Sequence, residues 1–396
     1  MPGTELFGPE EKREVNDVLE TGILFRYGHA SERQNICKSQ DFESEVKRFT
    51  GAKFSHAVSS GSAAILAALS ASGVGYNDEV IVPPFTFIAT IEAVLMLGAI
   101  PVFAEIDETL CLSAKGIQDA ITERTKAVCL VHMCGIAADM DPILEVIQNN
   151  NLILIEDAGQ AYGATYKGTF TGLFGKAGAY SFDFFKIATA AEGGVAVTND
   201  EETYKLIDTF TDHGHTHIGK VRGMEDHPIL GFNFRISELH SAIGLVQARR
   251  VPEIIKLNKR NKSILQEILS DIKGINFSHV PDKDGDTATF LNILCPDKEF
   301  AQKVNKELGK TSIGGYNYWF ENKYHFISNW EHLKNLKFPS TMAINKQDIP
   351  QDYNNLPLND STDIMSRLIS FGIRCAISED NVKKLGEDIA KVFNNI

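Results

Sequence analysis

Residues 151–160 read NLILIEDAGQ, an apolar run that closes on two carboxylates, an alanine and a glycine. A second run, KAVCLVHM at 126–133, is also almost continuously apolar. Runs of this kind, in which polar and apolar residues do not alternate, are typical of strands that are buried on both faces of a sheet. The two runs therefore predict central strands of a largely parallel sheet.

Strand-like and helix-like segments alternate on the N-terminal side of these runs. EVIVPPF at 79–85 and IPVFAEID at 100–107 are typical of strands, and ATIEAVLMLG at 89–98 lies between them with helical character. SAAILAALSASG at 62–73 and DFESEVKRFTG at 41–51 are also helix-like and end at glycines. This alternation predicts an α/β fold, with a mostly parallel sheet covered by helices.

The character of the chain changes near residue 250. KLNKRNKSILQEILSDI at 256–272 reads as a long polar helix, and the strands beyond it are more polar and separated by frequent turns. The length of 396 residues allows two or three domains of ordinary size. We expect a large domain over residues 1–250 and a smaller α+β domain over residues 251–396.

Charge and composition exclude several classes of protein. The net charge is −13, which argues against a nucleic-acid-binding protein because phosphates require a basic face. Residues 1–14 have neither the basic start nor the apolar core of a signal peptide, and the apolar stretch 80–104 is interrupted by prolines, so no membrane span is expected. The six cysteines form no CxxC pair, which favours reduced thiols and a cytoplasmic location.

Glycine-rich nucleotide motifs are missing from the expected positions. No G-x-G-x-x-G follows the first strand, and the chain contains no G-x-x-x-x-G-K-[ST]. A nicotinamide or ATP site of the standard type is therefore not expected.

Two polar motifs follow predicted strands, at the edge where open α/β sheets bind ligands. The serines and glycine at 59–62 (SSGS) precede an alanine-rich helix, whose first N–H groups could bind a phosphate. Asp157 could hold a protonated ring nitrogen at the end of its strand. Both motifs also fit ordinary helix caps.

Two further residues stand out because of their surroundings. Lys186 lies in the aromatic stretch YSFDFFK at 180–186, where burial would lower the pKa of its amine and suit it to bond a carbonyl group. Phe87, after two prolines, offers an aromatic face. Each has a simpler explanation: Lys186 could be an ordinary surface lysine, and Phe87 could be an ordinary core phenylalanine. A phosphate site, an aromatic plate, a carboxylate and a lysine together fit pyridoxal 5′-phosphate (PLP).

Several motifs make the chain resemble the DegT/DnrJ/EryC1 family of sugar aminotransferases. They are SSGSAA, PPFTFIATIEAV, IEDAGQAYGA, YSFDFFK, AEGGVAVTND and GFNFRISELHSAIGLVQ. The resemblance implies the type I (aspartate aminotransferase) fold, with a large, mostly parallel sheet of the seven-stranded type and a small α+β C-terminal domain. It also implies PLP as cofactor and a homodimer with a shared active site.

The resemblance assigns roles to individual residues. Lys186 bonds the cofactor aldehyde and Asp157 pairs with the ring nitrogen, and both are expected to be catalytic. The remaining cofactor contacts are Gln160 at the phenolic oxygen, Phe87 on the ring, Gly61, Ser62 and Ser181 at the phosphate, and Asn233 from the second subunit. Two positions depart from the family pattern: Ser62 replaces a threonine, and Ala191 replaces the first glycine of Gly-Glu-Gly-Gly.

Four other segments narrow the resemblance to transaminases of 8-amino-3,8-dideoxy-D-manno-octulosonate (8-amino-Kdo). They are residues 1–28, DHGHTH at 212–217, RGMEDHPILGFNFR at 222–235 and GGYNYWFENKYHFISNWEHL at 314–333. This branch implies L-glutamate as donor, the C8 aldehyde of 8-oxo-Kdo as acceptor and a place in lipopolysaccharide synthesis. The alternatives are a 3- or 4-keto sugar nucleotide as acceptor, and a PLP-binding regulator without turnover.

The substrate contacts are harder to predict. An acidic sugar needs a cation, for which Arg26 is the first candidate, followed by Arg222 and Arg374. His213 and His215 are expected to lie in a polar loop along the substrate pocket, and no metal site is expected there. Tyr318 and Trp319 could stack on a sugar face, although core packing would explain both.

Overall fold

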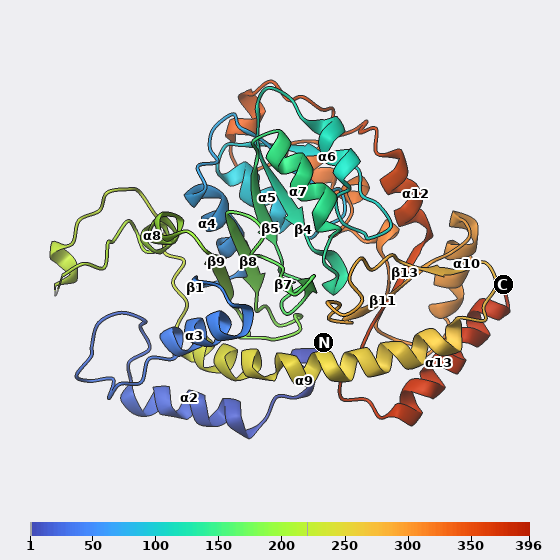
Figure 1. Cartoon of the computed structure of the whole chain (residues 1–396), viewed down its shortest axis with the longest axis horizontal. Coiled ribbons are helices and arrows are strands. Elements are labelled where there is room, and N and C mark those ends of the chain that lie inside the picture. The colour runs from blue at the N-terminus through green and yellow to red at the C-terminus, as the bar shows by residue number, and fades with distance from the viewer. Residues whose placement is uncertain (1, 220) are drawn as a thin grey trace.

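The computed structural model describes residues 2–219 and 221–396. Its large sheet has seven strands in the order β1-β9-β8-β5-β4-β2-β3 (Figure 1). The neighbours from β8 to β3 are parallel, whereas β9 is antiparallel to both β8 and β1. The predicted mostly parallel α/β sheet is confirmed. The strands are β1 Phe54–Val58, β2 Glu79–Val82, β3 Ile100–Phe103, β4 Thr125–Val131, β5 Ile153–Asp157, β8 Ala177–Ser181 and β9 Gly194–Thr198.

The two apolar runs that predicted the fold form neighbouring strands inside this sheet. β4 takes up most of KAVCLVHM and β5 most of NLILIED. Every β4 residue from Ala127 onward is buried, and so is every β5 residue after Ile153. Both faces of these strands are covered, which is why successive positions, and not alternate ones, carry apolar side chains.

Helices between the strands cover the sheet. α4 packs against β8 and β9 and is flanked by α5 and α8, and its many alanines let it approach the sheet closely. α2 and α3 both pack on the long helix α9 (Figure 1). The helices up to this point are α1 Pro2–Glu5, α2 Pro9–Thr21, α3 Lys38–Thr50, α4 Gly61–Ala71, α5 Ala89–Met96, α6 Ala114–Ala120, α7 Met140–Asn149, α8 Glu201–Phe210 and α9 Glu238–Leu269.

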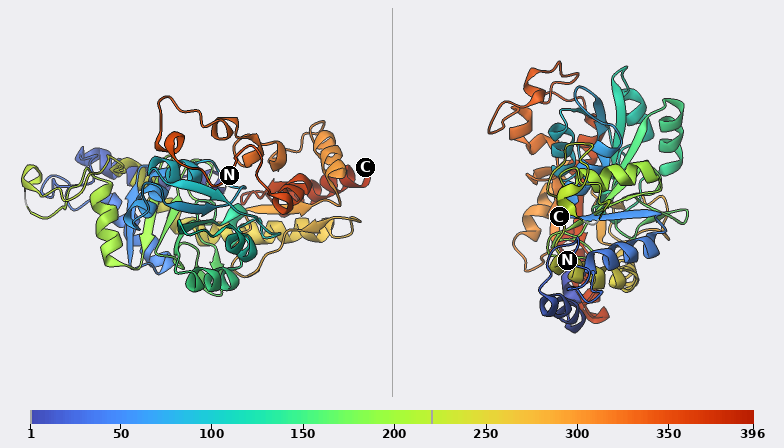
Figure 2. Two further views of the ribbon diagram at one scale, coloured as in Figure 1. Left: turned by 90° about the horizontal axis from the view of Figure 1, so that it is seen from above. Right: turned by 90° about the vertical axis from the view of Figure 1, so that its left-hand side faces the viewer.

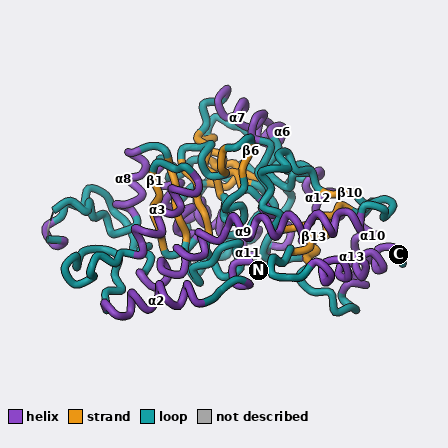
Figure 3. The backbone as a smooth tube through the Cα atoms, turned by 60° about the horizontal axis from the view of Figure 1, so that its bottom comes forward, coloured by secondary structure: helices purple, strands orange, loops and turns teal. Residues whose placement is uncertain are grey.

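A second sheet has four antiparallel strands in the order β10-β11-β13-β12. Its own apolar core includes side chains from α9, α10 and α13. The elements are β10 Asn276–Phe277, β11 Phe290–Leu294, α10 Lys298–Leu308, β12 Tyr316–Tyr318, α12 Asn359–Arg367, β13 Leu368–Gly372 and α13 Glu379–Asn394. Figure 3 shows α9 running from the part of the molecule that contains α3 and β1 to the part that contains β13 and α13, so this helix joins the two parts.

The segment between β12 and α12 returns to the large sheet. Phe326 and Trp330 are buried in the same apolar cluster as β2 and β3. The side-chain amide of Gln351 accepts from the N–H of Phe103 at 2.7 Å and donates to its carbonyl at 2.8 Å, which satisfies the exposed edge of β3 as a neighbouring strand would. Figure 2 shows this orange segment beside the blue strands.

The division expected at residue 250 falls inside α9, which continues through Pro252. Residues beyond position 250 contribute to the apolar core of the large sheet and to that of the four-stranded sheet. The two-domain division therefore stays a proposal. The remaining short elements are η1 Met133–Gly135, β6 Thr165–Tyr166, β7 Thr169–Phe170, η2 Arg222–Met224, η3 Trp319–Glu321, η4 Ile327–Asn329, α11 Glu331–Lys334 and η5 Ala343–Lys346.

No helix in the described part of the chain combines the length and the apolar character needed to cross a membrane.

Candidate active site

A cavity of about 700 Å³ lies where the carboxyl ends of β4, β5 and β8 face the four-stranded sheet. Ligands of open α/β sheets bind at this edge. Side chains from both sheets line the cavity, so the site requires the two parts of the chain to be packed together. The predicted residues in its lining are Gly61, Ser62, Phe87, Asp157, Gln160, Ser181, Lys186, Trp319 and Arg374.

Lys186 reaches this cavity from the turn between β8 and β9. Its backbone N–H donates to the carbonyl of Asp183 at 3.1 Å, which closes the turn. Burial lowers the pKa of the Lys186 amine, while the charges of Asp157 and Asp183 act in the opposite direction. The net lowering increases the fraction of neutral amine, the form that bonds a carbonyl carbon.

Asp157 is the last residue of β5 and is buried to 7% exposure. Its Oδ2 accepts a hydrogen bond from the hydroxyl of Thr90 at 2.7 Å, and its Oδ1 accepts one from the N–H of Gly159 at 2.9 Å. Donors to both oxygens fix the orientation of a carboxylate. The carboxylate is therefore ready to receive a protonated ring nitrogen from the cavity.

The neighbouring Glu156 points away from the cavity, because successive side chains of a strand face opposite sides. It accepts hydrogen bonds from three backbone N–H groups, those of Gly172, Phe174 and Gly175, each at 2.7 Å. The His132 ring lies 3.0 Å from the same carboxylate. The glycine run at 172–178 thus holds a structural turn.

A small-residue turn at the start of α4 faces Ser181. Ser60 caps the helix by accepting from the N–H of Ala63, as the simpler explanation of this motif required. The next N–H groups belong to Gly61 and Ser62, and they lie at the positive end of the helix dipole. A Cβ at position 61 would stand 2.7 Å from the Cβ of Ser181, so only glycine lets these segments meet. This cradle suits a phosphate group.

Phe87 and Gln160 complete the predicted cofactor contacts. Phe87 is 43% exposed and faces the cavity, with its ring 5.6 Å from the ring of His325. The Gln160 side chain is held by the N–H of Cys134, which donates to Oε1 at 3.1 Å. An exposed aromatic ring beside a polar cavity is suited to stacking on a planar ligand.

The structure adds residues that the sequence analysis did not select. Thr90 contacts Asp157, and His325 lines the cavity opposite Lys186. The Nδ1 of His325 donates to the amide oxygen of Asn322 at 3.0 Å, which leaves Nε2 as an acceptor. Burial, followed by the charge of Lys186, lowers the His325 pKa to about 4. His325 lies within the quoted segment at 314–333, but its spacing carries no signal for this contact.

Other predicted residues do not line the cavity of their own chain. Arg26 is buried, because its guanidinium pairs with Glu43 at 2.7 Å and donates to the carbonyl of Ala57 at 2.6 Å. Tyr318 belongs to β12 and donates its hydroxyl to the carbonyl of Ser366 at 2.9 Å. Asn233 pairs with Asp212 in an isolated bridge and is not among the lining residues. Only Trp319 of the two predicted stacking residues reaches the cavity.

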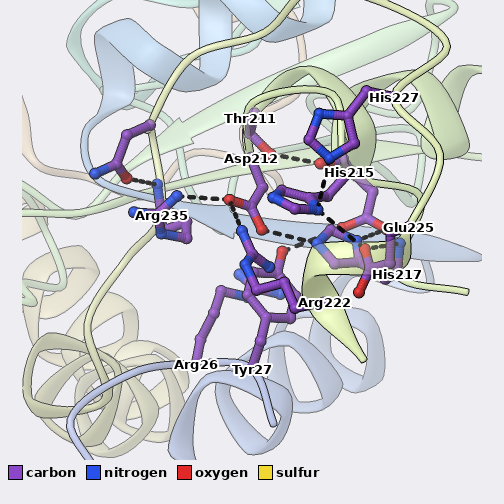
Figure 4. A network of polar contacts seen from close by, with 12 residues as sticks. Arg26, Tyr27, Thr211, Asp212, His215, His217, Arg222, Glu225, His227 and Arg235 are labelled. Carbon is purple, nitrogen blue, oxygen red and sulfur yellow. Dashed lines mark hydrogen bonds and ion pairs between the residues drawn. The ribbon is translucent and has the colours of Figure 1, made fainter. Parts of the chain in front are cut away.

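His215 and His217 belong to a separate polar network (Figure 4). The His217 ring lies between two carboxylates, with Nδ1 2.9 Å from Asp208 and Nε2 2.8 Å from Asp212. Asp212 also pairs with Arg222 and Arg235. His215 faces Glu225 and the ring of His227, while His213 donates its N–H to the carbonyl of Phe232. In one chain this loop does not line the substrate cavity.

Sequence comparison places these features in a known family. The model of the DegT/DnrJ/EryC1/StrS aminotransferase family matches residues 7–365. The chain belongs to this family. It is a PLP-dependent sugar aminotransferase, and the type I fold expected from the resemblance is confirmed.

Individual relatives agree with this assignment. The aminotransferase is 35% identical to the spore coat polysaccharide biosynthesis protein SpsC of Bacillus subtilis, over 87% of its own chain and 89% of that protein. It is 33% identical to the GDP-perosamine synthase of Escherichia coli O157:H7, over 77% and 80% of the two chains. The structure of PseC from Helicobacter pylori matches with a TM-score of 0.84 at 24% identity, over 98% of each chain, and shows the same fold.

The residues around the cavity fit PLP. The phosphate cradle at Gly61 would be filled by any side chain there, and the lowered pKa of Lys186 matches an amine that bonds the aldehyde. Asp157 presents a carboxylate with both oxygens already oriented. The aminotransferase therefore has an anion site, an amine and a carboxylate around one cavity, as the cofactor requires.

Proposed function

We propose that the aminotransferase transfers the amino group of L-glutamate to the C8 aldehyde of 8-oxo-Kdo and so forms 8-amino-Kdo for lipopolysaccharide. The sequence resemblance of four segments supports this acceptor. One feature of the cavity carries the proposal. Among the described residues that line it, Arg374 is the only arginine. A sugar acid with one carboxylate needs one such cation.

Arg374 is placed to bind an incoming anion. Its side chain is 67% exposed, and its Nε lies 3.5 Å from a carboxylate oxygen of Glu5, a long contact that a substrate acid could replace. The same lining contains Asp157, Asp183 and Glu192. A diphosphate would bring two further negative charges close to these carboxylates, whereas a single carboxylate at the rim would meet only Arg374.

We propose the following roles for the chain's own residues. PLP, when bound, supplies an aromatic ring that takes up the electron pair left when the Cα of glutamate loses its proton. The Nζ of Lys186 would bond the cofactor's aldehyde and, once free, would accept the proton that glutamate loses from Cα. Asp157 keeps the ring nitrogen protonated. Phe87 and Gln160 orient the ring, and the cradle of Gly61, Ser62 and Ser181 holds the phosphate.

We also propose that the enzyme is a homodimer in which Asn233 of the partner subunit reaches the phosphate. Asn233 is not among the described residues that line the cavity of its own chain, which fits a contact made to a second copy. The adjoining loop exposes large apolar side chains, a common mark of an interface. They are Ile218, Val221, Met224, Leu230 and Phe232, each more than half exposed. Cys37, Cys111, Cys129, Cys134 and Cys295 are free thiols, which supports a cytoplasmic location.

A keto sugar nucleotide is the second candidate acceptor, favoured by the name GDP-perosamine synthase of a relative. One experiment distinguishes the two acceptors. The enzyme is incubated with PLP and L-glutamate, the unbound reagents are removed, and each acceptor is added to the enzyme that carries the amino form of the cofactor. Return of the visible absorbance band, with an aminated product by mass spectrometry, identifies the acceptor. Reaction with a 4-keto nucleotide sugar and not with 8-oxo-Kdo would overturn the proposal.

Arg374→Gln tests the contact that carries the proposal. Loss of a hydrogen-bonded charge pair costs about 1.5–3 kcal/mol, so KM for 8-oxo-Kdo should rise about 10- to 100-fold. The C1 amide of 8-oxo-Kdo should bind both forms of the enzyme about equally. Arg13→Gln is a matched control, because Arg13 is 65% exposed and its partner Glu14 is 3.7 Å away. An unchanged KM in Arg374→Gln would refute the contact.

A further inference from the structure

Two buried threonines lie between the stacking residue Phe87 and the carboxylate of Asp157. Thr86 and Thr90 are each 1% exposed. Their hydroxyl oxygens are 2.8 Å apart, and the Thr90 hydroxyl donates to Oδ2 of Asp157 at 2.7 Å. The three side chains thus form one continuous line of hydrogen bonds that ends at the cavity.

The direction of these bonds follows from counting protons. A threonine hydroxyl has one proton to donate. The proton of Thr90 is directed at Asp157, so Thr86 must be the donor in the contact between the two hydroxyls. The Thr86 hydroxyl also lies 3.2 Å from the carbonyl oxygen of Phe87, so its proton is shared between that acceptor and Thr90. The Thr90 donation points at the carboxylate.

The backbone of the same turn holds the threonines in place. The N–H of Thr86 donates to the carbonyl of His325 at 2.9 Å, and the N–H of Thr90 donates to the carbonyl of Phe87 at 3.3 Å. Helix capping does not account for the two hydroxyls, because α5 begins after Ile88 without a side-chain cap. Packing alone would be served as well by valine, which has nearly the same shape.

We infer that Thr90, assisted by Thr86, is a positioning residue that orients the Asp157 carboxylate toward the ring nitrogen of PLP. The inference rests on the proposed pairing of Asp157 with that nitrogen, and it does not depend on which sugar is aminated. The pair also sets the position of the carboxylate relative to the ring of Phe87, because both are attached to one short turn.

The effect should appear mainly when the cofactor is bound. Asp157 borders the open cavity, so water can replace the Thr90 hydroxyl in the protein without cofactor. PLP would displace that water and leave Oδ2 with one donor fewer. Loss of the Thr90 hydroxyl should therefore weaken cofactor binding more than it lowers the stability of the free protein.

The test compares Thr90→Val, which removes the hydroxyl, with Thr90→Ser, which retains it. In Thr90→Val the Kd for PLP should rise and the rate of reaction with L-glutamate should fall. The two changes combined should amount to about 10- to 100-fold. The Kd is measured by titration of the visible band. The ¹⁵N shift of ring-labelled PLP should move toward the value of a neutral nitrogen. Thr90→Ser should stay within about 3-fold of the wild type, and Thr86→Val should show a smaller change in the same direction.

Thr50→Val is the matched control, because Thr50 is buried in α3 and donates to the carbonyl of Val46. It should leave Kd and the ¹⁵N shift unchanged. An unchanged ¹⁵N shift in Thr90→Val, or a Thr90→Ser as impaired as Thr90→Val, would overturn the inference. If Thr90→Val does not fold, Thr86→Val and Thr90→Ser still decide it. Asp157→Ala separates the two proposals: an unchanged shift there refutes the pairing with the nitrogen itself.

Discussion

The network around His217 makes a prediction about pH and stability. His217 stacks on Tyr27, with 4.1 Å between ring centroids, and contacts a carboxylate through each ring nitrogen (Figure 4). Burial alone would lower its pKa, but the hydrogen bonds and charges of Asp208 and Asp212 outweigh it and raise the pKa to about 9. At neutral pH the ring therefore carries a proton.

The magnitude follows from linkage between protonation and folding. A pKa of 6.5 in the unfolded chain and about 9 in the folded chain corresponds, at 1.36 kcal/mol per pKa unit, to about 3 kcal/mol. The side chain retains 16% exposure, so solvent screening reduces this to about 2 kcal/mol. Because the pKa is raised, this stability is fully present below pH 6.5 and is lost as the pH rises through 9.

The neighbouring groups do not titrate in that window. The pKa of Asp208 and of Asp212 is lowered, and Arg222 and Arg235 pair with Asp212. Burial also lowers the pKa of His56 to about 4 and raises that of Tyr27 far above its usual value. His215 likewise has a lowered pKa. The pH dependence of the stability difference between the wild type and a His217 variant, measured between pH 6.5 and 9, therefore reports on His217.

His217→Asn tests this prediction, because residue 217 has φ of 55° and asparagine tolerates that conformation. An unfolding entropy of about 2.1 cal/mol/K per residue makes about 2 kcal/mol equivalent to about 2 °C for this chain. Melting temperatures by circular dichroism should show the variant's deficit to be about 2 °C larger at pH 6 than at pH 10.

The control is His332→Asn, since His332 is exposed on α11. Its difference from the wild type should be the same at both pH values. A deficit of His217→Asn that is constant with pH, or that grows toward pH 10, would refute the reasoning. Raising the salt concentration should reduce the deficit only partly, because the ion pairs around Asp212 are mostly buried.

Two further predictions concern the turn between β8 and β9. Lys186→Ala should leave the fold intact but abolish the bleaching of the visible band by L-glutamate; measurable transamination in this variant would exclude the proposed role of the amine. Ala191→Gly should raise the melting temperature by about 1 °C. Ala191 has φ of 67°, a conformation in which a Cβ costs about 1–2 kcal/mol. Glycine removes this strain, but its greater freedom in the unfolded chain cancels part of the gain in stability. Urea denaturation measures the change in stability. Ala191→Val is the opposite case and should be less stable than the wild type. A glycine variant less stable than the wild type would contradict the argument.

The motifs at the strand ends were predictable because their signals are local. The run at 151–157 is apolar at successive positions, which specifies a buried strand, and its last residue must then lie at the ligand-binding edge of a parallel sheet. The same reasoning placed Gly61 and Ser62 at a helix start and Lys186 after a strand. All of these residues line the cavity.

Contacts between distant segments carry no comparable signal. The Thr90 hydroxyl meets Asp157 across 67 residues, and Gln351 meets Phe103 across 248. Arg26 resembled a free cation in the sequence, yet the fold places it against Glu43. The sequence around a charged side chain does not show whether its partner is a substrate or another residue, because pairing depends on distance in space.

The sequence by itself determined the alternation of strands and helices, the parallel sheet and the identity of the groups at its carboxyl edge. These follow from periodicity and turn chemistry within a few residues of each position. Only the tertiary structure decided which polar groups are paired. It placed the histidine loop in its own ion network and brought Arg374 and His325 to the cavity, because those contacts arise from packing the four-stranded sheet and its connecting segments against the large one.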